Sequence, residues 1–255
     1  MLEKATAKLI KSLEYKKYRK RHNLFVAEGP KAVGDLMKRI TPAKVFATHE
    51  WKRPEWPVAD IVDVTDSELS KISFLQHPQQ VLGLFPLPQE RDASKLDPQN
   101  ELILALDGIQ DPGNLGTIIR LADWFGIETI VCSHETTDAY GPKAVQATMG
   151  SLARVDIIYT DLCETLRKHH NGTGAKIYGT VLDGENIYAK KLDGCGFLVM
   201  GNEGNGISEP LRAQLDERLL IPCFRQGEHA ESLNVAIATA IACSEFRRRR
   251  AIKKD

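Results

Sequence analysis

The sequence predicts an α/β protein with two domains, and three observations support this. In the second half of the 255-residue chain, apolar runs alternate with helical patterns, which is typical of a parallel sheet with helices on both faces. Three blocks rich in glycine and asparagine, at 106–120, 199–208 and 231–236, each begin where an apolar run ends. The ends of such strands are the places where open α/β sheets bind ligands. Residues 85–100 are polar, contain three prolines and lack a hydrophobic period, so they predict a linker. We therefore expect domains over residues 1–88 and 98–255.

The first domain is expected to form a small α/β/α sandwich. Apolar spacing and turn residues define its elements, and Pro30 favours a helix that begins there. The predicted helices are residues 4–11, 30–39 and 66–72, and the predicted strands are 24–27, 44–47, 59–64 and 81–84.

The second domain is expected to contain five strands and five helices in alternation. The strands are predicted at 102–106, 129–132, 177–182, 197–200 and 219–221. The helices are predicted at 115–125, 142–150, 162–169, 209–215 and 233–250.

Composition excludes several classes of protein. No stretch approaches the roughly 18 apolar residues that span a bilayer, and the first segment is charged and unlike a signal peptide, so a soluble cytoplasmic protein without membrane contact is expected. The five cysteines are widely separated and include no CxxC pair, which argues against a zinc site and a disulfide framework. We expect no bound metal.

Both ends of the chain are basic although the formal net charge is zero. Residues 1–40 hold eight Lys and three Arg against four carboxylates, and the last ten residues hold four Arg and two Lys against Asp255. This asymmetry indicates a polyanionic partner, whereas solvated helix faces would explain it equally well. Within the first of these regions, Lys16–Lys–Tyr–Arg–Lys–Arg21 combines cations with Tyr18, as an RNA-binding segment does.

The three blocks carry the candidate chemistry. In the first, the sequence Asp-Pro-Gly-Asn at 111–114 forms a turn before a helix, and Arg120 falls on the polar side of that helix. In the second, Glu203 is embedded among glycines whose spacing fits neither a dinucleotide fingerprint nor a Walker loop. In the third, Ser232 or Asn234 lies near the start of the last helix, where a plain N-cap is the alternative.

Taken together, the three blocks resemble a known family. In this order and spacing, residues 111–120, 201–208 and 232–236 closely resemble motifs 1, 2 and 3 of the SpoU (TrmH) family of RNA ribose 2′-O-methyltransferases. The resemblance covers about residues 100–250. The N-terminal part is similar to that family's L30e-like substrate-binding domain through Arg19, Arg21, Phe25, Glu28 and Gly29.

The resemblance implies a fold, an activity and a site. The fold is the SPOUT fold, a parallel sheet with a C-terminal trefoil knot, and family members are homodimers with an active site completed near the subunit interface. S-adenosylmethionine would be held mainly by backbone groups and apolar side chains at Thr180, Val181, Leu182, Met200, Gly201, Ile221, Pro222 and Leu233. Methylation of a ribose 2′-hydroxyl would involve Arg120, Asn114, Glu203, Ser232 and Asn234, and RNA would contact Arg19, Arg21 and Phe25. Because arginine has a very high pKa, Arg120 suits phosphate binding and alkoxide stabilisation better than general-base catalysis.

Several alternatives stay open. The L30e-like domain favours ribosomal RNA, with 23S as the expected substrate, over transfer RNA by family analogy only. A non-catalytic RNA-binding protein would explain the basic ends but would not require Arg120, Glu203 and Asn234 together. A dinucleotide-dependent oxidoreductase would need a glycine fingerprint that this chain lacks. In addition, Gln146 and Thr148 stand where many family members have Arg and Ser, so an RNA contact there is in doubt.

Overall fold

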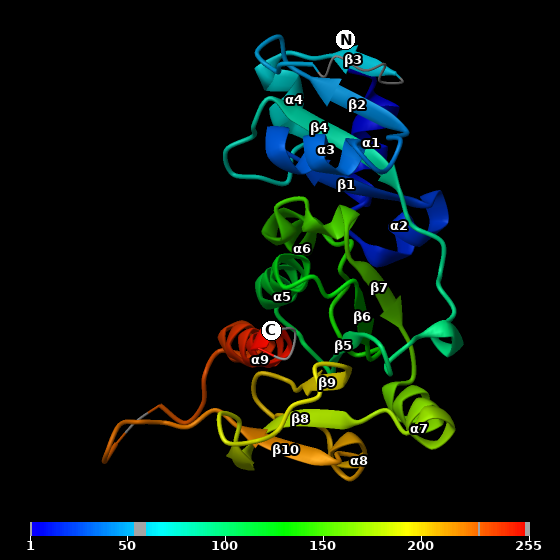
Figure 1. Ribbon diagram of the computed structural model, residues 1–255. Coiled ribbons are helices and arrows are strands. Elements are labelled where there is room, and N and C mark those ends of the chain that lie inside the picture. Colours follow the sequence, from blue (N-terminus) through cyan, green and yellow to red (C-terminus); the bar gives the residue numbers. More distant parts are fainter. Residues whose placement is uncertain (1, 54–59, 229, 253–255) are drawn as a thin grey trace. The chain divides into compact units, whose positions relative to one another are not determined.

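A six-stranded parallel sheet organises much of the second half of the chain in the computed structural model, which describes residues 2–53, 60–228 and 230–252 (Figure 1). Its strand order is β10-β8-β9-β5-β6-β7, and the paired strands run parallel, which confirms the predicted fold class. The strands are β5 (Leu102–Leu106), β6 (Thr129–Cys132), β7 (Asp156–Tyr159), β8 (Ile177–Asn186), β9 (Gly196–Met200) and β10 (Glu217–Leu220). The knot implied by the family resemblance stays a prediction.

Helices cover both faces of this sheet. Alternate strand residues such as Ile103, Ala105 and Val131 pack against α7 (Leu162–Thr173) and α8 (Glu209–Arg212). On the other side of the sheet, α5 (Pro112–Trp124) and α9 (Val235–Ile252) pack against each other (Figure 1). Because β5 is apolar and buried throughout, it forms the centre of this layered core. A short 3₁₀ helix, η1 (Ala93–Lys95), precedes the sheet.

Local chemistry shifts several element boundaries from those predicted. Helix α5 begins at Pro112 because the Asp111 carboxylate accepts a hydrogen bond from the Asn114 N–H at 2.7 Å and caps the helix. Strand β7 was not predicted, since it is a short edge strand whose residues are only partly apolar. Strand β8 continues to Asn186, past the predicted end at 182, and is interrupted by a bulge. No described helix is long and apolar enough to cross a membrane.

The remaining residues form a first unit that is described by itself. Residues 1–89 group with residues 138–153, a grouping that the sequence did not predict, and the domain limits 1–88 and 98–255 stay a prediction. A four-stranded sheet of order β1-β4-β2-β3 lies at the centre of this unit. Its elements are α1 (Lys4–Ser12), α2 (Lys16–His22), β1 (Leu24–Glu28), α3 (Pro30–Met37), β2 (Lys44–Ala47), β3 (Ile61–Asp63), α4 (Asp66–Ile72), β4 (Val81–Pro86), α6 (Pro142–Thr148) and the 3₁₀ helix η2 (Ser151–Ala153). Residue 59, the predicted start of the third strand, lies outside the described residues.

An ion pair inside the first unit joins two distant parts of the sequence. The Arg19 guanidinium contacts the Asp138 carboxylate at 2.7 Å and donates to the carbonyls of Leu13 and Glu14, both at 2.7 Å. Only 4% of the Arg19 side chain is exposed. Helix α2, which carries Arg19, has no apolar period and was not predicted, so this ion pair holds a polar helix in place.

Phe25 strengthens the same junction. Its ring is fully buried and packs against Phe85 and Tyr140, with centroids 5.7 and 5.3 Å away. The prediction that Arg19 and Phe25 contact RNA does not fit this burial, because neither side chain offers surface to a ligand. Both residues are structural.

Replacing Arg19 with Ala should destabilise the protein by about 3 kcal/mol or more, because removing one partner of a buried ion pair leaves an uncompensated charge. Equilibrium unfolding in urea measures this change. Lys20→Ala is the matched control, since Lys20 is exposed on the same helix and its loss should cost less than about 0.5 kcal/mol. Equal losses for the two variants would contradict the structural role of Arg19.

Candidate active site

The loop after β9 is folded back on itself by Asn202. The Asn202 backbone exchanges two hydrogen bonds of 2.9 Å with Gly206, and its side-chain oxygen accepts from the N–H groups of Gly204 and Asn205. Its amide nitrogen donates to the Gly108 carbonyl at 2.7 Å. A Cβ on Gly201 would lie 2.2 Å from the Gly206 backbone, so only glycine fits there. The sequence offered the glycines as a signal but not the organising role of Asn202.

Glu203, at the tip of this loop, is bound to the first block. Its carboxylate accepts hydrogen bonds from the N–H groups of Gln110 and Asp111, both at 3.2 Å, and from Asn114 Nδ2 at 3.0 Å. Partial burial alone would raise the pKa of Glu203, but these hydrogen bonds outweigh it and hold the pKa below its ordinary value. Glu203 is therefore an ionised acceptor at neutral pH.

Asn114 connects the first block and the Glu203 loop to the third block. Its side-chain oxygen accepts a hydrogen bond from Asn234 Nδ2 at 2.9 Å. The Asn234 oxygen in turn caps α9, accepting from the N–H groups of Ala236 at 2.9 Å and Ile237 at 3.3 Å. Of the two candidates near the start of the last helix, Ser232 and Asn234, it is Asn234 that caps α9. Its side chain also bonds to Asn114, so it has a capping role and a place in the site at the same time.

Arg120 and Ser232 are not joined to this chain of hydrogen bonds. Both side chains are exposed, and neither makes a hydrogen bond or ion pair with any described residue. Arg120 follows Asn114 by six residues on α5, which places it about 9 Å further along the helix axis. Its guanidinium is free to meet a ligand.

Most of the predicted cofactor residues lie within or directly after three neighbouring strands of the sheet, β8, β9 and β10. Strand β10 pairs through Arg218 with Gly179 and through Leu219 with Glu185, so residues 180–184 of β8 bulge out of the ladder. The Thr180 hydroxyl donates to the Met200 sulfur at 3.6 Å, which places the ends of the β8 and β9 segments together. Leu182 and Leu233 are exposed, and Ile221 and Pro222 are half-buried. Two apolar side chains of the predicted cofactor set, Leu182 and Leu233, are thus open to a ligand.

A cavity of about 460 Å³ lies beside the loop of Asn202 but contains none of the predicted site residues. The carboxyl ends of β5, β6 and β7 line it, and its carboxylates include Asp107, Glu135 and Asp161. Burial, and then the charges of Asp161 and Asp107, raise the pKa of the Cys163 thiol in its wall. This acidic cavity does not suit a phosphate group. Within the described residues, no group of three His, Cys, Asp or Glu side chains could hold a metal ion.

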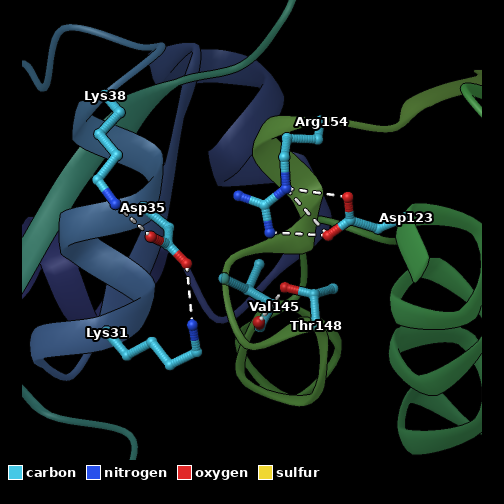
Figure 2. A network of polar contacts seen from close by, with 7 residues as sticks. All are labelled: Lys31, Asp35, Lys38, Asp123, Val145, Thr148 and Arg154. Carbon is cyan, nitrogen blue, oxygen red and sulfur yellow. Dashed lines mark hydrogen bonds and ion pairs between the residues drawn. The ribbon is translucent and has the colours of Figure 1, made fainter. Parts of the chain in front are cut away.

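The two residues that depart from the family pattern differ in exposure. Thr148 is fully buried and its hydroxyl donates to the Val145 carbonyl at 2.7 Å within α6 (Figure 2), whereas Gln146 is half-buried. Thr148 therefore offers no RNA contact. Arg21 is exposed on α2, and its RNA contact stays a prediction.

Comparisons with known proteins identify the family of this chain. The sequence pattern of the SpoU rRNA Methylase family matches residues 101–244, and that of the MRM3-like substrate binding domain matches residues 4–83. The chain is 30% identical over 241 residues to the 23S rRNA (guanosine(2553)-2′-O)-methyltransferase RlmP of Bacillus subtilis (strain 168), which covers 93% of this chain and 94% of that protein.

Solved structures give the same result. An RNA methyltransferase assigned to the TrmH family, from Porphyromonas gingivalis, superposes with a TM-score of 0.87 at 40% identity, over 98% of this chain and 99% of that one. An AdoMet-bound rRNA methyltransferase from Sinorhizobium meliloti superposes with a TM-score of 0.84 at 31% identity, over 97% of this chain and 96% of that one. These comparisons place the protein among the α/β RNA methyltransferases. It belongs to the SpoU rRNA methylase family.

Replacing Glu203 with Gln should destabilise the protein by roughly 0.5–1 kcal/mol near pH 7, at the low end because the side chain is exposed. Because its folded pKa is lowered, the Glu203 carboxylate stabilises the fold above its ordinary pKa, and this contribution is lost as pH falls through the folded pKa. The difference between wild type and variant in urea unfolding should therefore stay constant from pH 7 down to the ordinary pKa of 4.5 and shrink as the pH falls below it.

The control for this measurement is Glu101→Gln. It removes the same charge from the same unit at an exposed side chain that has no hydrogen bond within the described part of the chain. A pH-independent difference for Glu203→Gln, or one that matches Glu101→Gln, would show that the carboxylate does not hold the loops together.

Proposed function

We propose that this protein is an S-adenosylmethionine-dependent RNA ribose 2′-O-methyltransferase that acts on 23S ribosomal RNA. The observation that carries the proposal is the chain of hydrogen bonds from Glu203 through Asn114 to Asn234, which joins the three loops that resemble the family motifs. Relatives that match more than nine-tenths of this chain are named for ribosomal RNA, which favours it over transfer RNA. A ribosomal RNA substrate also supports a cytoplasmic location.

The surface among the ends of β8, β9 and β10 fits the cofactor. Exposed Leu182 and Leu233 offer apolar contacts for a flat base. We assign Thr180, Val181, Leu182, Met200, Gly201, Ile221, Pro222 and Leu233 to S-adenosylmethionine. When bound, the cofactor supplies a methyl group already activated on a sulfonium sulfur. The chain must then align the ribose 2′-hydroxyl and stabilise the oxygen as its proton leaves.

The catalytic side chains have different roles in this proposal. Arg120 is exposed and has no partner within the described residues, so its guanidinium binds a substrate phosphate and stabilises the developing alkoxide. Glu203 accepts three hydrogen bonds and its pKa is lowered, which makes it a poor proton acceptor and a good anchor for its loop. Asn114 and Asn234 hold the first and third loops together through their side-chain hydrogen bond. Ser232 is exposed two residues before Asn234, where it can contact the substrate.

The RNA interface of the first unit is assigned to α2. Lys20 and Arg21 are exposed there, and Tyr15 is exposed beside Tyr18 with ring centroids 6.5 Å apart. Cations beside an exposed aromatic ring can neutralise phosphates and stack an unpaired base. Tyr15, which the sequence did not single out, replaces Phe25 as the stacking residue.

Ribose-methylation mapping of total RNA from cells with and without the gene tests the function. One 2′-O-methyl mark in 23S RNA should disappear on deletion and return with the wild-type gene. Arg120→Ala should restore little, because removing one oxyanion-stabilising donor lowers kcat by about 10² to 10³. Calorimetry in a chelating buffer should show unchanged S-adenosylmethionine affinity for the variant, because Arg120 lies away from the cofactor loops and the site needs no metal.

Other outcomes of this experiment separate the alternatives. Loss of a methylation mark from transfer RNA would show that transfer RNA is the substrate. An unchanged methylation map with retained RNA binding would favour a non-catalytic RNA-binding protein. Near-normal single-turnover rates for Arg120→Ala would remove Arg120 from the mechanism.

We also propose a homodimer whose two sites each use both chains. Trp124 is 83% exposed at the end of α5, and Ile237 is exposed on the adjoining helix α9, which is more apolar surface than a monomer needs there. Arg120, four residues before Trp124, is not joined to Asn114 within its own chain. A second copy packed on this face brings Arg120 to the partner's site.

Co-expression of two inactive variants tests this arrangement. Arg120→Ala and Asn114→Ala should each be nearly inactive, but mixed dimers should regain up to half of the wild-type activity per heterodimer, since one of their two sites is then intact. A different affinity tag on each variant, with purification on both tags in succession, isolates the mixed dimers. If each chain has its own complete site, both sites of the mixed dimer are damaged and no activity returns.

A further inference from the structure

A second cavity, of about 520 Å³, lies in the first unit between α3 and the residues that follow β2, and the proposed active site does not use it. Its wall includes Lys31, Gly34 and Asp35 from α3 and Lys38 directly after it, together with Trp51 and Lys52. Its volume lies within the range of roughly 300–1,000 Å³ that small-ligand sites occupy, so it has room for a nucleotide.

Asp35 holds two of the lysines at the edge of this cavity. Its carboxylate lies 3.1 Å from Lys31 Nζ and 2.9 Å from Lys38 Nζ, with the two amines on either side of it (Figure 2). The lysine side chains are 65% and 61% exposed, against 15% for Asp35. Each ammonium has three N–H donors and gives one to Asp35, so the others remain available to a ligand. The cations are therefore positioned before any ligand binds, which reduces the entropy lost on binding.

Gly34 lies on α3 between these lysines. A Cβ added there would meet no described atom within 4 Å, and its backbone needs no left-handed conformation. Glycine inside a helix is less stable than alanine, so neither packing nor backbone geometry within the described residues accounts for it. The missing side chain leaves the helix backbone open to close approach from the cavity.

We propose that this cavity binds one nucleotide of the RNA substrate, with a phosphate against Lys31, Lys38 and Lys52 and the strand close to Gly34. The proposal rests on the proposed function, in that the substrate is RNA. A nucleotide offers anionic phosphate together with N–H and O–H donors, which matches a wall that has lysines as well as the carboxylates of Asp35 and Glu50. The carboxylate side chains of an acidic peptide have no donor for Asp35 or Glu50, whereas the base and ribose of a nucleotide bring N–H and O–H donors beside the phosphate.

Three full-length variants test the site. Gly34→Glu fills the cavity with a carboxylate, Gly34→Ala adds only a methyl group, and Lys31→Ala with Lys52→Ala removes two cations. The matched control is Lys8→Ala with Lys71→Ala, two exposed lysines of the same unit outside the cavity. The probe is a short fluorescent oligouridylate, with its affinity measured by anisotropy over a range of KCl concentrations and the fold checked by thermal unfolding.

We expect Gly34→Ala to keep or raise the Tm, and Gly34→Glu to remain folded but bind the oligonucleotide at least about tenfold more weakly. The double lysine variant should flatten the log–log salt dependence by up to about 1.4, at about 0.7 per phosphate contact, whereas each Lys8 or Lys71 substitution should leave it nearly unchanged.

Wild-type affinity in folded Gly34→Glu, or equal slopes for the two double variants, would overturn the proposal. So would a wild-type protein that does not bind the probe, or displacement of the probe by polyglutamate as readily as by unlabelled RNA, which would indicate an acidic protein partner. The methylation map is read separately. If no methylation mark is lost but Gly34→Glu weakens RNA binding, the proposed enzyme activity is wrong and the proposed RNA-binding cavity stands. If a mark is lost but Gly34→Glu binds RNA like the wild type, only the cavity proposal is wrong.

Discussion

The site depends on one set of contacts, the hydrogen bonds that run from Glu203 through Asn114 to Asn234. Glu203 and Asn114 lie 89 positions apart in the sequence and Asn114 and Asn234 lie 120 apart, and these contacts bring their loops together. Arg247 fixes the same helices at their other ends, since its guanidinium donates to the carbonyls of Phe125 and Gly126 where α5 ends. Helices α5 and α9 are thus joined near both ends and run in the same direction. This double attachment gives the backbone a fixed geometry before any ligand binds, as preorganised catalysis requires.

The basic residues at the two ends of the chain serve two purposes that the sequence could not separate. Arg19 is buried against Asp138, Arg247 caps α5, and Arg248 and Arg249 both bind the buried Glu245 carboxylate. These cations are structural. Exposed cations such as Lys20 and Arg21 on α2 remain for RNA. Charge counting along the chain therefore overestimates the surface available to a polyanion, because it cannot detect which guanidinium groups are already paired.

Sequence reasoning predicted what depends on local pattern and failed where distant partners decide. The apolar run of β5 and the Asp-Pro turn before α5 are local signals, so the parallel sheet and the first block could be foreseen. The burial of Arg19 depends on Asp138, which is 119 residues away, and that of Phe25 depends on Tyr140. Strand β7 depends on pairing with β6 at the sheet edge, since its own residues are only partly apolar. The assignments of the cofactor and catalytic residues come from family resemblance and stay proposals.

The zero net charge constrains how this protein selects RNA. With 34 cationic and 34 anionic side chains, the whole molecule has little long-range attraction for a polyanion. At physiological ionic strength, exposed charges act over about 8 Å, so binding must come from local groups of cations. The cavity beside the loop of Asn202 is acidic and repels phosphates, whereas α2 and the cavity at Lys31 present cations. These two groups of cations add to the affinity only when one RNA molecule contacts both at the same time. This favours a folded RNA whose shape matches their positions over an arbitrary single strand.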